Sequence, residues 1–410
     1  MTEFYEKVKE RLIRYAKVDT QSANFSKTVP TTMKQFDLAR MLKDELSEIG
    51  ASEVYLDTEK CVVYGKIPAN TEGKPLGLVA HIDTAPDASG ADVKPWVLEN
   101  YDGGNIVLNQ EKNIVMSPDE FENLKMYIGQ DLILTDGTTL LGGDDKASIA
   151  AIMTFAEYVI AHPELKHGLI SIAFTPDEEV GGLARDLDLA RFESPTAYTL
   201  DGDHLGWYEN ETFNASQAVV TLHGKSVHTG TAKGIMKNAV DIGSEFMRLL
   251  PEFEKPQYTE GREGFYHAVS FSATCEEGRI VLIIRDHDAL HFKQREEYLK
   301  KTVQYLKNKY GEECIELEIN PQYRSMKEII DQVPWMIDHL IEAIQACGIE
   351  PVCDAFRGGT DGSALSHRGL PAPNLSAGYE NAHGRFEYVP IQSMEKNVEI
   401  LLKLMEIMCR

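Results

Sequence analysis

Long apolar runs are missing from this 410-residue sequence, and no stretch approaches the roughly 20 residues that a membrane-spanning helix needs. Cysteine is scarce: the six residues are scattered, and no two form the CxxC pair typical of thiolate zinc sites or redox centres. This usage is typical of reduced thiols in a cytoplasm rather than of a disulfide framework. The N-terminal segment MTEFYEKVKERL is amphipathic and contains acids, unlike a secretory signal or a transit peptide. We therefore expect a cytoplasmic protein without a membrane span.

Basic residues are also in the minority, with 41 Lys and Arg against 65 Asp and Glu and a net charge of -24 at pH 7. Such an acidic surface repels phosphate backbones and anionic lipid headgroups, so neither nucleic acid nor a membrane is expected as a partner. Bound divalent cations would offset part of this charge. The remaining composition, 43% hydrophobic and 26% charged, is typical of a globular protein.

The length exceeds what a single core usually holds, so two domains are expected. Helical periodicity alternates with short β-rich runs, which predicts an α/β layered domain. The predicted helices are 2–17, 34–49, 145–161, 334–347 and 391–409, and the predicted strands are 53–56, 61–67, 76–81, 131–135, 168–175, 196–200, 351–356 and 372–376. The turn-rich stretch 84–130 is interpreted as a loop that crosses the surface.

The pattern changes between residues 211 and 322, where the predicted order is β-α-β-β-α-β. The predicted strands are 218–224, 267–275, 279–285 and 313–319, and the predicted helices are 235–250 and 289–309. This order is the ferredoxin-like, split βαβ arrangement, which forms a small sheet with two helices on one face. We therefore expect one domain from residues 1–210 and 323–410, with a second domain, 211–322, inserted into it.

One short apolar run ends in a histidine followed two residues later by an aspartate, in Leu76-Gly-Leu-Val-Ala-His81-Ile-Asp83. A strand that stops at His81 places the imidazole at a sheet edge, where open α/β folds bind ligands. Asp83 can hold the second ring nitrogen in the tautomer that a metal ion requires. Alone, the tripeptide is more typical of a hydrogen-bonded surface histidine, so its interpretation depends on the rest of the chain.

Further acids and a second histidine occur at comparable positions. They are Asp144 and Asp145 after a diglycine that opens a helix, Glu178 and Glu179 after a strand, Asp201 at a strand end, and His383 after a strand and loop. Each alone is typical of a helix cap or a solvated acid, but together they belong to one predicted sheet edge. Two imidazoles and three carboxylates without a thiolate suit zinc, manganese or cobalt in an open hydrolytic site. A bridging carboxylate would create a two-metal centre, and the adjacent acids Glu178 and Glu179 offer one metal ligand and one general base.

Several motifs give the chain a wider resemblance. They are Val18-Asp-Thr-Gln-Ser, Thr28-Val-Pro, His81-Ile-Asp-Thr, Leu141-Gly-Gly-Asp-Asp-Lys, Phe174-Thr-Pro-Asp-Glu-Glu-Val-Gly, Glu260-Gly-Arg-Glu-Gly-Phe-Tyr-His, Arg357-Gly-Gly-Thr-Asp-Gly and His383-Gly. With these motifs the chain resembles the zinc metallopeptidases that include glutamate carboxypeptidase and acetylornithine deacetylase. Over nearly its full length it is most similar to the bacterial tripeptide aminopeptidases within that superfamily.

This resemblance implies a zinc-aminopeptidase-like catalytic domain with a central mixed sheet flanked by helices, and an inserted lid domain. It also implies two zinc ions per chain, for which manganese or cobalt could substitute. His81 and Asp201 would bind one ion, Glu179 and His383 the other, and Asp144 would bridge them. Relatives often dimerise through such a lid, so a homodimer is a further expectation.

The resemblance also implies roles outside the ligand set. Asp83 would orient His81, Glu178 would be the general base, and His228 of the lid would stabilise the oxyanion. Three further residues would contact the peptide: Asn238, Arg285 and Arg357. The arginines suit its carboxylate because the guanidinium fork pairs with a carboxylate through two hydrogen bonds.

These patterns predict a metallo-aminopeptidase that removes the N-terminal residue from short peptides, preferentially tripeptides. A deacylase or carboxypeptidase of the same superfamily would share every ligand, so only pocket residues distinguish that alternative. A non-catalytic binding protein of this fold is a second alternative, which the complete ligand set disfavours. Asp203 and His204 replace a glycine run usual after the position of Asp201, and their role is left open between tuning of the site and solvent exposure.

Overall fold

The computed structural model describes residues 3–182 and 184–410, and these form two compact units. Unit 1 contains the residues up to Asn210, Met326–Asp354 and Thr360–Arg410, and unit 2 contains Glu211–Ser325 and Ala355–Gly359. The short return segment 355–359 contains the end of the predicted strand 351–356 and the start of the Arg357-Gly-Gly motif. It belongs to unit 2 because Gly358 accepts a hydrogen bond from the Phe213 N–H at 3.1 Å.

Unit 1 is built on an eight-stranded mixed sheet. In spatial order its strands are β1 (Ser52–Leu56), β2 (Val63–Ile67), β8 (Ile170–Thr175), β3 (Leu76–His81), β9 (Ala197–Leu200), β16 (Asn374–Leu375), β10 (Trp207–Thr212) and β15 (Val352–Phe356). The four central strands, β8, β3, β9 and β16, are parallel, whereas β1, β2 and β10 pair antiparallel with their neighbours. β3 and β8 are buried along their whole length, as expected for parallel strands covered on both faces.

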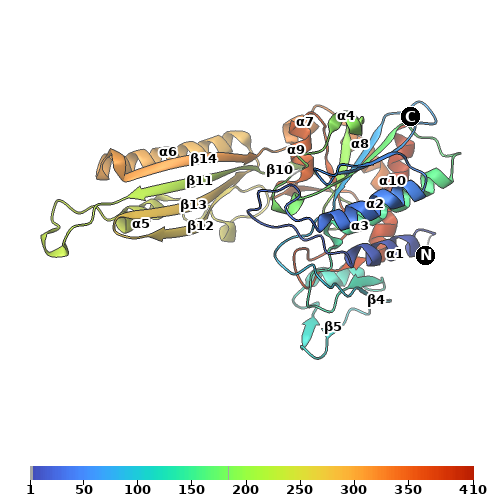
Figure 1. The fold of residues 1–410 in the computed structure, drawn as a ribbon, viewed down its shortest axis with the longest axis horizontal. Coiled ribbons are helices and arrows are strands. Elements are labelled where there is room, and N and C mark those ends of the chain that lie inside the picture. Colours follow the sequence, from blue (N-terminus) through green and yellow to red (C-terminus); the bar gives the residue numbers. More distant parts are fainter. Residues whose placement is uncertain (1–2, 183) are drawn as a thin grey trace. The chain divides into compact units, whose positions relative to one another are not determined.

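Helices flank this sheet. They are α1 (Tyr5–Ala16), α2 (Gln35–Glu48), α3 (Gly143–Ala161), α4 (Leu189–Phe192), α7 (Lys327–Ile330), α8 (Trp335–Ala346), α9 (Asp361–His367) and α10 (Ile391–Ile407). α1, α3 and α10 pack against one another (Figure 1). α1 does so because Val8, Leu12 and Tyr15 recur at helical spacing and are fully buried on one stripe. Residue 2, where that helix was predicted to begin, lies outside the described residues.

The stretch 84–130 differs from the prediction of a surface loop. It contains β4 (Trp96–Leu98), the hairpin β5 (Ile106–Asn109) and β6 (Ile114–Met116), and a 3-10 helix (Glu122–Tyr127). β4 pairs with β7 (Leu132–Leu134), which also pairs with β17 (Val389–Pro390), over a separate small core. Strands of three or four residues are too short to show a clear alternation of apolar and polar positions, which is why the sequence pattern missed them.

Unit 2 has the predicted β-α-β-β-α-β order. Its elements are β11 (Asn214–His223), α5 (Ala239–Leu249), β12 (Phe265–Ala273), β13 (Glu277–Asp286), α6 (Ala289–Tyr310) and β14 (Ile315–Tyr323). The antiparallel sheet has the order β12-β13-β11-β14. Alternate residues of β13, Ile280, Leu282 and Ile284, are fully buried in one core with residues of α5 and α6. Both helices therefore cover the same face of this sheet.

The sequence patterns missed β10, β17, α4, α7 and α9. Each of these elements has seven residues or fewer. The longer predicted helices and strands are confirmed, with ends that differ by a few residues. Within the described part of the chain, no helix has the length and apolarity that crossing a membrane requires.

Candidate metal centre

The parallel strands of unit 1 deliver the predicted residues to one edge of the sheet. β3 ends at His81, which lies beside Thr175 at the end of β8 in the parallel register. β9, on the other side of β3, ends at Leu200 directly before Asp201. Ligands in open α/β sheets bind at this carboxyl end, so the strand topology alone brings these residues together.

Three residues form a first group of potential ligands: His81, Asp144 and Asp201, whose donor atoms lie within 4.8 Å of one another. His81 Nε2 is 3.0 Å from Asp144 Oδ1. The hydroxyl of Tyr379 donates a hydrogen bond to Asp201 Oδ1 at 2.9 Å and so orients that carboxylate.

A second group contains Asp144 again, with Glu179 and His383, also within 4.8 Å. His383 Nε2 is 3.2 Å from Asp144 Oδ2 and 2.9 Å from Glu179 Oε2. Asp144 therefore presents one oxygen to each histidine. A carboxylate shared in this way has the arrangement of a bridging ligand between two metal ions.

Asp83 belongs to neither group among the described residues. It is completely buried, and its carboxylate accepts hydrogen bonds from the N–H groups of Glu178 and Glu179 at 2.9 and 3.3 Å. His81 Nδ1 lies 3.1 Å from the main-chain oxygen of Asp83 and 3.4 Å from its carboxylate. Asp83 thus connects the histidine to the turn that carries both glutamates. The backbone N–H of His81 itself donates to Asp145 Oδ2 at 3.0 Å.

Three acids of the site, Glu178, Glu179 and Asp201, have raised pKa values. Burial raises the pKa of Glu178 well above its ordinary value, raises that of Glu179 to about 8, and also raises that of Asp201. These shifts arise because burial and neighbouring carboxylates disfavour the charged form. An acid with a raised pKa beside a metal pair is suited to accept a proton near neutral pH.

The pKa values of the two histidines, His81 and His383, are also raised. Hydrogen bonds to Asp144 and Glu179 raise the pKa of His383 to about 11. Burial opposes protonation of His81, but its contacts with Asp144 and Asp83 outweigh burial and raise its pKa well above the usual value. For Asp144, the two histidines likewise outweigh burial, and its pKa is lowered.

We predict that the metal-stripped chain becomes less stable as the pH rises from about 5 to 8. A group whose pKa is higher in the folded state contributes stability that is complete below its unfolded pKa and is lost as the pH rises through its folded pKa. This applies to Glu178, Glu179, Asp201 and the two histidines, whereas Asp144 is ionised in both states over this range. Each extra proton held by the folded state changes the free energy of unfolding by about 1.4 kcal/mol per pH unit.

Thermal unfolding in a chelator across this pH range measures the effect. The metal-loaded chain is the control, and its unfolding temperature should fall less because metal ions displace these protons. A metal-stripped chain whose stability rises or stays level between pH 5 and 8 would contradict the assigned shifts.

The donor set fits a pair of divalent ions. Glu179 Oε1 is buried and has no hydrogen-bond partner among the residues that the structure describes, although Glu179 lies in the second group. An unpaired buried carboxylate oxygen is costly, and a metal ion would satisfy it. Imidazole and carboxylate ligands without a thiolate are typical of catalytic rather than structural sites.

The turn that carries Glu178 and Glu179 has a second support that the sequence analysis missed. Asp177 adopts a left-handed backbone conformation (φ 64°) and is buried. Its carboxylate accepts hydrogen bonds from the N–H and hydroxyl of Thr31, at 2.8 and 2.5 Å, and from the Gln35 amide at 2.7 Å. Thr31 directly follows the Thr28-Val-Pro motif, which was the only sequence signal for this contact.

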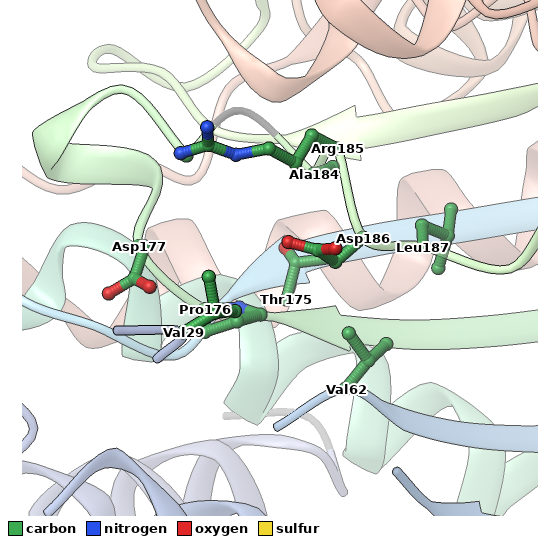
Figure 2. A pocket seen from close by; sticks show the side chains of 10 residues that line it. Val29, Val62, Thr175, Pro176, Asp177, Ala184, Arg185, Asp186 and Leu187 are labelled. Atoms are coloured by element: carbon green, nitrogen blue, oxygen red, sulfur yellow. The ribbon is translucent and has the colours of Figure 1, made fainter. Parts of the chain in front are cut away.

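A small cavity lies behind the same turn and is shown in Figure 2. It is lined by Val29, Val62, Thr175, Pro176, Asp177, Gly182, Ala184, Arg185, Asp186 and Leu187. Its volume of about 10 Å³ is near the lower limit for one water molecule. This cavity is therefore a packing gap and not a peptide-binding site.

The side chain of His204, whose role the sequence left open, pairs with a glutamate of unit 1. Its Nδ1 lies 2.6 Å from Glu380 Oε1, and only 24% of its side chain is exposed. Glu380 also accepts hydrogen bonds from Asn123, at 2.7 Å, and from the hydroxyl of Tyr127. Burial raises the pKa of Asp203 to about 6. His204 is thus part of a hydrogen-bond network and does not simply extend into solvent.

The other predicted site residues belong to unit 2. His228 is exposed, and its Nδ1 accepts a hydrogen bond from the Gly230 N–H at 3.1 Å. Asn238 caps α5 by accepting from the Val240 N–H at 3.0 Å. These local contacts place His228 within the segment between β11 and α5, and Asn238 at the end of that segment.

The two arginines have partners within the same unit. Arg285 donates to the main-chain oxygens of Ile284 and Ser216 at 2.9 and 3.3 Å, and its guanidinium lies 5.3 Å from the ring centre of Tyr323. Arg357 donates to the main-chain oxygens of Gly261 and Glu263 at 2.7 and 2.9 Å. Arg357 therefore stabilises the loop before β12, which is a structural task that the sequence did not indicate.

Comparison with known proteins extends these observations. A family described as a peptidase dimerisation domain matches residues 210–314. Two solved structures share the fold over nearly the full length of both chains. The aminopeptidase PepT from Bacillus cereus has a TM-score of 0.78 at 20% identity, with 99% of each chain covered. A dinuclear metal-binding peptidase of the M20 family from Bacillus subtilis has a TM-score of 0.68 at 13% identity, with 98% of each chain covered.

Fold and site together define the class: the chain shares the fold of a peptidase of the M20 family, with a mixed-sheet unit that contains both candidate ligand groups and an inserted module that matches a peptidase dimerisation domain. The relatives found by sequence identify the family within this class. Peptidase T from Caldanaerobacter subterraneus subsp. tengcongensis is 49% identical over 403 residues, which cover 98% of each chain. The chain belongs to the peptidase T family, which confirms the resemblance and the fold expected from the motifs.

Proposed function

We propose that the chain is a two-zinc aminopeptidase that removes the N-terminal residue from short peptides, preferentially tripeptides. The observation that carries this proposal is the placement of Asp144 between two ligand groups. Membership of the peptidase T family supports the substrate class. The deacylase and carboxypeptidase alternatives are not favoured, because the near-full-length relatives are named peptidase T.

In this proposal His81 and Asp201 would hold one zinc ion, Glu179 and His383 would hold the other, and Asp144 would be a ligand of both. When bound, such ions polarise the scissile carbonyl and lower the pKa of water toward ~7. Manganese or cobalt could replace zinc, because the same oxygen and nitrogen ligands suit these metals.

The chain's own residues move the protons. Glu178 takes a proton from the attacking water as its oxygen adds to the scissile carbonyl carbon, and then gives that proton to the leaving nitrogen as the C–N bond breaks. Asp83 keeps the His81 ring and the Glu178 turn in place through the contacts described above. From the family resemblance we assign His228 to stabilise the oxyanion, and Asn238 to contact the substrate.

The same resemblance assigns Arg285 and Arg357 to the carboxylate of the peptide. Replacing either arginine by alanine is expected to raise KM for a free tripeptide roughly tenfold or more, because a charge-assisted hydrogen bond contributes about 1.5–3 kcal/mol. The C-terminally amidated tripeptide lacks that charge, so its KM should rise less. Steady-state kinetics on both peptides measure the difference.

Arg279 provides a matched control, because it lies on the same strand as Arg285 and is exposed. Arg279→Ala should leave the ratio of the two KM values unchanged. Equal increases for the free and amidated peptides in Arg285→Ala and Arg357→Ala would exclude a carboxylate contact, and would leave Arg357 only its role in the loop before β12.

The proposed function is tested with a matched series of di-, tri- and tetrapeptides, with metal content determined on the same sample. Highest kcat/KM on the tripeptide, release of its N-terminal residue and about two zinc ions per chain are expected. Preferred release of the C-terminal residue, or cleavage of N-acyl amino acids, would instead support the carboxypeptidase or deacylase alternative.

We place this activity in the cytoplasm and propose a homodimer as the assembly. None of the six cysteines forms a disulfide within the described part of the chain, which fits a reducing compartment. The match of residues 210–314 to a peptidase dimerisation domain supports the dimer.

A further inference from the structure

A buried carboxylate outside both ligand groups holds the loop that carries the bridging residue. Glu387 is 2% exposed. Its Oε2 accepts hydrogen bonds from the N–H groups of Leu141 and Gly142 at 2.8 and 2.7 Å, and its Oε1 accepts one from the N–H of Asp144 at 2.9 Å. Three backbone donors from the Asp144 loop thus converge on one side chain.

The diglycine before Asp144 is explained by this contact. A Cβ atom on Gly143 would lie 3.1 Å from Glu387 Oε1 and only 2.4 Å from a methyl carbon of Val389. Gly142 donates its N–H to the same carboxylate and has a φ of 78°, a conformation that disfavours a side chain there. The loop therefore needs both glycines in order to close around Glu387.

Glu387 also belongs to the segment that carries His383. The two ends of this segment pair through their backbones: the N–H of Glu380 donates to the main-chain oxygen of Tyr388 at 2.9 Å, and the N–H of Tyr388 donates to that of Glu380 at 3.1 Å. Within it, the N–H of Glu387 donates to the main-chain oxygen of Gly384 at 3.3 Å. The residue that holds the Asp144 loop is thus fixed to the loop of a ligand from the second group.

We infer that Glu387 is a positioning residue that sets Asp144 against His383, so that one carboxylate can serve both metal sites. This inference rests on the proposed two-metal centre. A carboxylate is the suitable side chain because it only accepts hydrogen bonds, and all three partners are donors. In Glu387→Gln one oxygen becomes an NH₂ group, which must then face a backbone N–H.

The test compares metal binding by the wild-type chain and Glu387→Gln, each stripped and then titrated with Zn²⁺ against a chromophoric chelator. Loss of such an outer contact typically weakens metal binding 10- to 100-fold, and that range is expected here. The visible absorption spectrum of the Co²⁺-loaded chains provides a second readout, because it reports ligand geometry and should change in the variant. Glu387→Asp keeps the charge but is one methylene shorter, so its affinity should lie between the two.

Glu45→Gln is the matched control. Glu45 is also a buried carboxylate of unit 1, accepting hydrogen bonds from Arg11 and Tyr15 at 2.8 and 2.7 Å, but it does not contact the Asp144 loop. The Glu45→Gln variant should be less stable than the wild-type chain when both are stripped of metal, but its Co²⁺ spectrum should not change. Wild-type zinc affinity and an unchanged spectrum in a folded Glu387→Gln would overturn the inference, and if that variant does not fold, the same result in Glu387→Asp would do so. A wild-type chain that binds no pair of ions would instead refute the two-metal proposal itself.

Discussion

Replacing Glu178 by glutamine is expected to lower kcat for a tripeptide by about 10²–10⁴-fold, the usual contribution of a general base. The amide keeps the shape of the side chain but cannot take a proton from water. Metal content should remain at about two ions per chain, because Glu178 is outside both ligand groups. The measurement combines kcat with metal analysis of the same preparation.

The backbone of Glu178 supplies the reason to expect an intact site in this variant. Its N–H donates to Asp83, and that bond does not involve the side chain that is changed. Asp83 should therefore still hold both His81 and the turn. A Glu178→Gln variant with nearly wild-type kcat would remove Glu178 from the role of base. A variant that loses its ions would show that Glu178 acts as a ligand.

Replacing Asp144 by alanine is expected to have the second large effect: loss of both metal ions together with the activity. Asp144 presents one oxygen to His81 and the other to His383, so its removal takes a ligand from each site. Metal-ion catalysis supplies several kcal/mol of transition-state stabilisation, so the rate should fall by roughly 10³-fold or more. Metal analysis after gel filtration, and kcat at saturating peptide, measure the two losses.

His383→Ala is the matched comparison, because His383 belongs to only one of the two groups. His383→Ala should weaken the binding of one ion and leave the binding of the ion assigned to His81 and Asp201 unchanged. An Asp144→Ala chain that retains two ions would contradict the bridging assignment. Equal loss of both ions in Asp144→Ala and His383→Ala would show that the two sites fill only together.

The residues that could be predicted from the sequence are those whose position depends on local pattern and strand order. The positions of His81 and Asp201 could be predicted because β3, β8 and β9 are parallel. Their carboxyl ends therefore lie at the same edge of the sheet, and His81 and Asp201 lie at two of these ends. The β-α-β-β-α-β order of unit 2 was predictable for the same reason, because its strands are long enough to alternate. The roles within the ligand set came from the family resemblance rather than from any pattern.

The residues that were missed act through contacts between segments far apart in the chain. Asp177 meets Thr31, and Glu387 meets Leu141, in each case across more than a hundred positions. Neither has a spacing or composition that distinguishes it from a solvated acid. Glu387 lies close to His383 in the sequence, but only the folded loop shows that three backbone N–H groups surround it.

The order of the ligands along the chain has a consequence for the making of this protein. His81, Asp144 and Glu179 precede unit 2, whereas His383 and Glu387 follow it. During translation the ribosome therefore delivers all of one ligand group and most of the other well before the last imidazole and its supporting carboxylate. A nascent chain therefore contains only one complete ligand group until unit 2 has been synthesised. Competence to cleave peptides is thus among the last properties that the growing polypeptide acquires.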